Sequence, residues 1–78
     1  MDRATIIHRA NDLEERVWLE EYHIATQKRI IDQLERDGND AQIAKGRLVR
    51  FEALLAVLVA ERERLKMELA GLGPDDAE

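Results

Sequence analysis

The residues best suited to chemistry in this chain are Glu20 and His23, in the stretch LEEYH. A Glu-x-x-His spacing puts a carboxylate and an imidazole on one face of a helix, as in bundles that hold a di-iron centre. A dimer would bring two such motifs together, but the other two helices would each have to add an inward glutamate. The second predicted helix has Leu55 and Leu58 at that level. We therefore expect no metal and no cofactor, and keep a dimeric metal-binding four-helix bundle as the alternative function.

No other group of residues suggests catalysis. His8 lies about 22 Å from His23 by helical rise, so the two histidines cannot share a site. The chain has no serine, and its two threonines, Thr5 and Thr26, have no evident base beside them. A glycine-rich phosphate loop is also missing. We expect no catalytic residues and a protein that is not an enzyme.

The elements that would position these side chains are two long helices joined by a tight turn. The stretch RDGND, residues 36–40, is the one interior cluster of glycine and polar residues. Gly38 suits the left-handed position that closes a helix, and Asn39 or Asp40 suits the N-cap of the next helix. Gln42 could complete a capping box with Asn39. These signals predict a turn at residues 38–40.

The chain ends define the rest of the single predicted domain, residues 1–73. Asp2 or Thr5 could cap the first helix, which we expect at about residues 4–37. Gly71, Gly73 and Pro74 end the second helix, expected at about residues 41–72. Residues 74–78 are predicted to be a disordered acidic tail.

Apolar residues recur at alternating steps of three and four in both helices, which is typical of coiled-coil packing. The fold class predicted is therefore all-α, an antiparallel two-helix hairpin. In the first helix, Glu20 and Gln27 interrupt a row formed by Ala10, Leu13, Val17, Ile24, Ile31 and Leu34. In the second helix, Arg62 interrupts a row formed by Ala44, Leu48, Phe51, Leu55, Leu58, Leu65, Leu69 and Leu72.

A turn near Gly38 and Asn39 sets the register in which the two rows meet. The expected pairs are Leu34 with Ala44, Ile31 with Leu48, Ile24 with Leu55, Leu13 with Leu65, and Ala10 with Leu69. Arg62 falls opposite Val17, one turn from Glu20 and Glu21. Because an unpaired charge between helices is costly, we expect Arg62 to pair with one of these glutamates.

The stretch FEALLAVLVA, residues 51–60, has more apolar residues than one partner helix can cover. The first helix has a matching surplus at the same level, near the middle of the hairpin. An isolated hairpin would expose this apolar belt to water, which is unusual for a soluble monomer. We predict a homodimer, a four-helix bundle, with Trp18 as anchor and with interface residues Trp18, Leu19, Tyr22, Leu54, Val57 and Val59. An antiparallel dimer keeps the acidic tails apart, and a parallel dimer is the alternative.

Composition limits the other function classes. The net charge of −5 is spread along the chain without a basic face, so nucleic-acid binding is not expected. The chain has no cysteine, its N-terminus does not resemble a signal peptide, and its apolar run is about half the ~20 residues that a membrane span needs. We expect a cytoplasmic protein without a membrane span.

Residues 23–65 resemble short uncharacterised helical-hairpin proteins of alpha-proteobacteria with the pattern HIxxQxxxIxxLExxGxDxxxAxxLLxxFExxL. The matching residues are His23, Ile24, Gln27, Ile31, Leu34, Glu35, Gly38, Asp40, Ala44, Leu48, Phe51, Glu52 and Leu55, while Val49 replaces the second leucine of the pair. Some of these proteins carry histidines where this chain has Leu58 and Glu61. The resemblance implies a bacterial origin and a hairpin fold, and no known activity. The sequence thus favours a small structural or protein-interaction module, with its process and any other partner protein unidentified.

Overall fold

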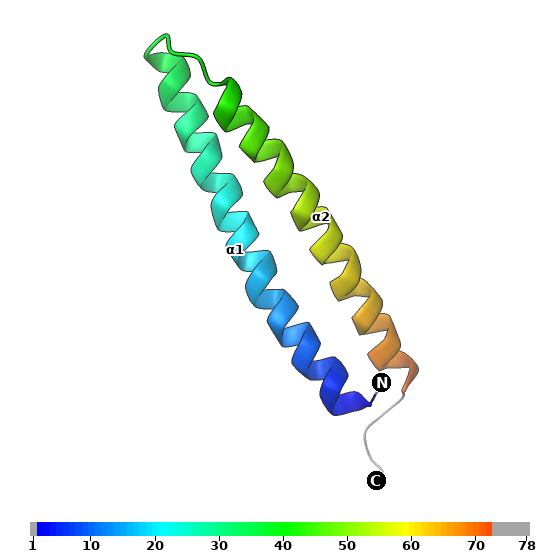
Figure 1. Cartoon of the computed structure of the whole chain (residues 1–78). Coiled ribbons are helices and arrows are strands. Elements are labelled where there is room, and N and C mark those ends of the chain that lie inside the picture. Colours follow the sequence, from blue (N-terminus) through cyan, green and yellow to red (C-terminus); the bar gives the residue numbers. More distant parts are fainter. Residues whose placement is uncertain (1, 73–78) are drawn as a thin grey trace.

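The computed structural model describes residues 2–72, which form two antiparallel helices and one linker (Figure 1). Helix α1 spans Arg3–Arg36 and helix α2 spans Gln42–Gly71. The predicted all-α hairpin is confirmed, and each helix end lies within one residue of the expected position. The tail predicted to be disordered, residues 74–78, lies outside the described residues.

Both ends of α1 are capped by hydrogen bonds that the sequence suggested. The backbone N–H of Thr5 donates to Asp2 Oδ1 at 2.8 Å, so Asp2 is the N-cap. At the other end Gly38 has φ +74°, the left-handed conformation that glycine adopts most readily. The N–H of Asn39 donates to Leu34 O at 2.8 Å, and that of Gly38 donates to Glu35 O at 3.1 Å. These two bonds form a Schellman motif, which ends α1 sharply.

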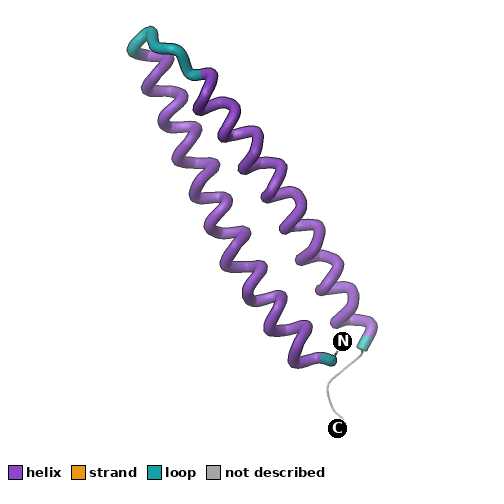
Figure 2. The backbone as a smooth tube through the Cα atoms, viewed as in Figure 1, coloured by secondary structure: helices purple, strands orange, loops and turns teal. Residues whose placement is uncertain are grey.

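Helix α2 starts differently from the prediction. Ala41 is its N-cap residue and makes no side-chain capping bond, so the capping box expected between Asn39 and Gln42 does not form. Asp40 Oδ1 instead accepts the N–H of Gln42 at 3.0 Å. The linker turns back along the hairpin before α2 begins (Figure 2), and the buried side chain of Ala41 fixes it there.

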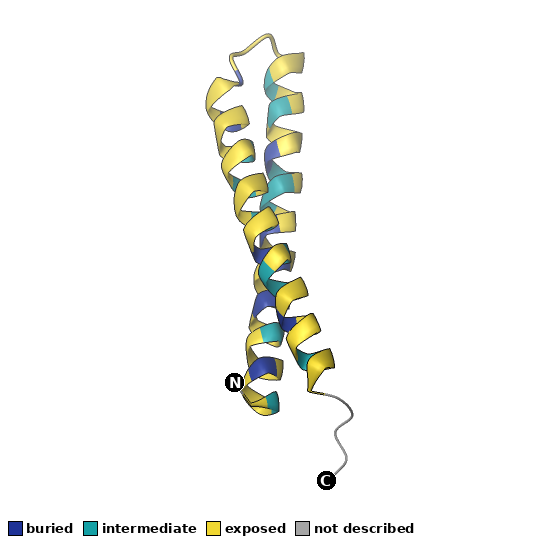
Figure 3. Cartoon of the chain, turned by 90° about the vertical axis from the view of Figure 1, so that its right-hand side faces the viewer, coloured by how far each residue is buried: buried dark blue, intermediate teal, exposed yellow. Residues whose placement is uncertain are grey.

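The hairpin is a rod of 63 × 14 × 13 Å with a radius of gyration of 17.8 Å. A globular chain of the same length would have a radius of gyration of about 11.5 Å. Buried residues line only the inner side of each helix, and exposed residues cover the outside (Figure 3). Of residues 2–72, seven apolar residues are buried, whereas eleven large apolar residues are exposed. A single hairpin therefore leaves much of its apolar surface in water.

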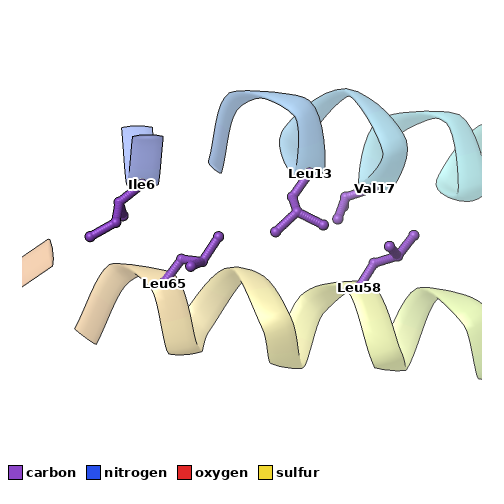
Figure 4. Close-up of a cluster of buried hydrophobic side chains, with 5 residues drawn as sticks. All are labelled: Ile6, Leu13, Val17, Leu58 and Leu65. Atoms are coloured by element: carbon purple, nitrogen blue, oxygen red, sulfur yellow. The ribbon is translucent and has the colours of Figure 1, made fainter. Parts of the chain in front are cut away.

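The largest buried cluster lies in the half of the hairpin away from the turn. It consists of Ile6, Leu13, Val17, Leu58 and Leu65, with Ala10, Leu55, Val59 and Leu69 packed against it. Leu65 lies between Ile6 and Leu13, and Val17 points toward Leu58 (Figure 4). Ile6 is fully buried although the predicted row began at Ala10. It continues that row by one step of four residues.

The register differs from the predicted one in the middle of the hairpin. Val17 faces Leu58, one turn from the predicted Arg62 (Figure 4). The expected ion pair of Arg62 with Glu20 or Glu21 is wrong, because Arg62 Nη1 lies 3.2 Å from Glu14 Oε1. The linker explains the shift, since a non-helical residue advances the chain up to about 3.3 Å against 1.5 Å in a helix. Helix α2 thus starts further along α1 than a tight turn would allow.

Candidate interaction surface

Glu20 and His23 are only three residues apart in α1, but Glu20 lies inside the helix interface and His23 lies at its edge. Glu20 occupies a core position, is only 9 % exposed, and its Oε1 has no hydrogen-bond partner among the described residues. His23 is half-buried at the edge of the helix interface. Its ring stacks on Phe51 of α2 with 4.9 Å between ring centroids and 18° between planes. Each side chain is therefore held by packing against α2, one inside the interface and one beside it.

Metal ligation by one hairpin would need more ligands than this pair supplies. Within residues 2–72, no three His, Asp or Glu side chains gather in a group that could hold a metal ion. The core positions of α2 level with Glu20 are apolar, as the sequence indicated. A site built on Glu20 and His23 would thus require the same residues of a second chain.

Four ring side chains connect the outer side of α1 to the helix interface. Trp18 stacks on Tyr22 with 6.2 Å between ring centroids, and Tyr22 meets His23 edge-on at 6.0 Å. The stack of His23 on Phe51 completes the series. Ring contacts within this row thus connect the exposed side chains of Trp18 and Tyr22 to the helix interface.

Five of the six residues predicted for the interface are exposed in the hairpin. The exposed fractions are 66 % for Trp18, 44 % for Leu19, 54 % for Tyr22, 38 % for Leu54 and 64 % for Val57. The sixth residue, Val59, is half-buried and packs against the core cluster. Its side chain already packs within the hairpin, so it offers less surface to another chain.

Ion pairs distinguish the two sides of the hairpin. On one side Lys45 lies 2.9 Å from Glu35, and Arg62 pairs with Glu14. We call this side the charged face. The residues that flank the helix interface on this side form a column in each helix, because they recur every seven positions. They are Glu14, Glu21, Lys28 and Glu35 in α1 and Lys45, Glu52, Val59 and Lys66 in α2. On the opposite side Arg9 pairs with Glu61 at 3.3 Å, and His23 stacks on Phe51.

The second side carries the apolar residues, and we call it the Leu54 face. It is formed by Leu19, His23, Ile30, Leu54 and Val57. Ile30, 39 % exposed, was not among the predicted interface residues. Its signal in the sequence is its position, seven residues after His23, which puts it in the same flanking column.

The predicted belt therefore does not form one flat surface. By heptad position, Leu19 and Val57 stand beside the column of Leu54, whereas Trp18 and Tyr22 stand on the outer side of α1. Trp18 borders a shallow, open depression whose lining comes from α1 alone: Glu14, Glu15, Arg16, Trp18 and Leu19. A single partner lying on the Leu54 face would leave Trp18 outside the contact.

Beside the Leu54 face, Glu61 pairs with both Arg64 and Arg9. The hydrogen bond from Arg64, the largest cause, lowers the pKa of the Glu61 carboxyl, and the charges of Arg64 and Arg9 lower it further. The same contact raises the pKa of Arg64. Glu61 is thus held as a carboxylate at the end of this face away from the turn.

Comparison with known proteins gives no further assignment. The chain matches no protein-family model, no curated protein and no solved structure. Neither of the two helices in the described residues is long and apolar enough to cross a membrane.

Proposed function

We propose that this protein is a small, non-catalytic structural or protein-interaction module that self-associates through its central apolar residues into a two-fold dimer, a four-helix bundle. The observation that carries the proposal is the exposure of Leu19, Leu54 and Val57 at one level of the rod. An exposed apolar patch of this kind marks an interaction site. We also propose that the chain is related to the alpha-proteobacterial hairpin proteins that residues 23–65 resemble, and this relationship is consistent with a structural role.

The small core supports the same function. Chains of this size usually need staples or oligomerisation, because a single core of this size contributes only about 3–5 kcal/mol. No cysteine is present to form a disulfide. A second hairpin would cover apolar residues that the first leaves in water, and would thereby enlarge the small buried core.

Light scattering coupled to size-exclusion chromatography tests the proposal. At micromolar concentration we expect a mass of twice 9.0 kDa for the wild type. A mass of 9.0 kDa across the accessible concentration range would reject self-association as the function.

Metal binding is a second candidate because one observation favours it. Glu20 Oε1 is buried without a hydrogen-bond partner among residues 2–72, and His23 lies one turn further along the same helix. In a dimer, two copies of this pair would supply a carboxylate and an imidazole each. Elemental analysis of protein purified without chelators tests this: stoichiometric iron, manganese or zinc that disappears in His23→Ala would support it. Metal-free protein with an unchanged dimer mass would exclude it.

A further inference from the structure

We propose that the second copy docks on the Leu54 face, antiparallel to the first, with a two-fold axis that crosses α2 at Leu54. This inference rests on the proposed dimer and adds which face is used, which orientation the copies take, and which residues pair between them. It also places Trp18 and the charged face outside the contact.

The flanking columns select the face. Helices of a four-helix bundle bury their core positions and one flanking column each. On the Leu54 face the central flanking residues are Arg16, His23, Ile30 and Leu54, and of these only Arg16 carries a fixed charge. On the charged face they are Glu21, Lys28 and Glu52, together with Val59, which already packs on the core. Covering the charged face would remove these charges from water, which is costly without partners.

The two-fold axis brings opposite charges together along α2. Leu54 meets Leu54 of the second copy at the axis. Arg47, seven residues before Leu54, then faces Glu61 of the second copy, seven residues after it. Arg47 makes no ion pair among residues 2–72, and Glu61 is held as a carboxylate by Arg64. The arrangement occurs twice, once on each side of the axis, and complementary charge of this kind fixes orientation.

Helix α1 supplies a second match. His23 lies beside Phe51 and Val17 faces Leu58, so Leu54 is level with Glu20 and Glu21. The axis therefore crosses α1 at Glu20 and Glu21. Arg16 lies about one turn before the axis, so it comes level with the residues about one turn after the axis in α1 of the second copy. Thr26 Oγ1 and Gln27 Oε1 in that stretch are buried without a hydrogen-bond partner among the described residues. The Arg16 guanidinium offers donors to these acceptors.

The distribution of charge also favours the antiparallel orientation. Residues 24–52, the half of the hairpin near the turn, have six basic and five acidic side chains. The other half, residues 2–23 and 53–72, has six basic and nine acidic side chains. An antiparallel dimer places the acidic half of each copy beside the less acidic half of the other, whereas a parallel dimer places the two acidic halves together.

A matched pair of substitutions tests the face. Val57 and Val49 are both valines of α2 and are both 64 % exposed. By heptad position, Val49 stands on the other side of α2 from the Leu54 face. Light scattering at micromolar concentration should give the mass of one chain for Val57→Glu and that of two chains for Val49→Glu, with equal helicity by circular dichroism. A dimeric Val57→Glu, or a monomeric Val49→Glu, would overturn the chosen face while the wild-type dimer, and thus the proposed function, still stands.

Cross-linking tests the orientation, and the cysteine-free chain makes the result simple to read. Leu54→Cys should form a disulfide-linked dimer on mild oxidation, because the axis brings the two copies of this residue together. Val49→Cys, equally accessible to oxidant, should stay monomeric on a denaturing gel. A parallel dimer would instead put Leu54 beside α1 of the other copy. Failure of Leu54→Cys alone to cross-link, with efficient linking when mixed with Leu19→Cys, would overturn the antiparallel arrangement.

Discussion

At the residue scale, two polar side chains of α1 occupy positions that the pattern reserves for apolar ones. Glu20 and Gln27 each stand in the core row of α1, each is 9 % exposed, and each has a side-chain oxygen without a partner in the described residues. A buried polar atom without a hydrogen bond costs about 1–3 kcal/mol. These residues therefore lower the stability of the single hairpin.

Replacing the buried carboxylate should stabilise the hairpin. We expect Glu20→Leu to raise the free energy of unfolding by about 1–3 kcal/mol, because an apolar side chain of similar size removes the unpaired acceptor. Chemical denaturation followed by circular dichroism measures the change. The control is Glu21→Leu at the neighbouring exposed position, which should change stability by less than about 0.5 kcal/mol. A less stable Glu20→Leu would show that Oε1 has a partner in the assembled protein.

Glu61 gives a residue-scale prediction about pH. Its pKa is lowered in the folded chain, first by the hydrogen bond from Arg64 and then by the charges of Arg64 and Arg9. A lowered folded-state pKa contributes stability above the ordinary carboxyl pKa, and this is lost as the pH falls through the folded value. NMR titration of the side-chain carboxyl should show a larger upward pKa shift in Arg64→Gln than in Arg9→Gln. The reverse order would contradict the role given to Arg64.

At the element scale, two glycines in similarly open surroundings should respond to alanine with opposite signs. An added Cβ meets nothing within 4 Å at either Gly38 or Gly46, so only backbone conformation matters. Gly38 has φ +74°, and Gly38→Ala should cost about 1–2 kcal/mol. Gly46 is inside α2, and Gly46→Ala should gain about 0.5–1 kcal/mol. Thermal unfolding of both variants checks the signs; equal signs would contradict the Schellman turn.

The register of the helices is a second element-scale prediction. Because Val17 faces Leu58, the double variant Val17→Cys/Leu58→Cys should form a disulfide within one chain. Val17→Cys/Arg62→Cys, the pair expected from a tight turn, should link poorly. Peptide mapping after oxidation distinguishes the two. Preferred linking of residues 17 and 62 would restore the tighter register.

The sequence predicted the elements better than their alignment. Helix ends follow from local chemistry, so Asp2 and Gly38 could be identified without a structure. The path of the linker could not, because Ala41 has no capping side chain and its burial depends on α1. This path places Arg62 beside Glu14 and not beside Glu20, since a change in the non-helical linker shifts every later contact.

At the scale of the whole molecule, the rod shape leaves eleven large apolar residues of the described chain, residues 2–72, exposed to water. The rod buries one side of each helix and leaves its middle apolar on the Leu54 face. The sequence predicted the apolar belt, but it treated Trp18 and Val57 as one surface. Assigning them to different sides required the ion pairs Arg9–Glu61 and Glu35–Lys45, which show which flanking columns meet. Long side chains in exposed columns give no such information from sequence alone.

Sedimentation equilibrium of the unmodified chain tests self-association most directly. Run from low to high micromolar concentration, it should give a mass that rises to a plateau at twice 9.0 kDa, because a closed two-fold contact stops at two copies. A mass that stays at 9.0 kDa, or one that keeps rising past two copies, would contradict the closed dimer built on the Leu54 face.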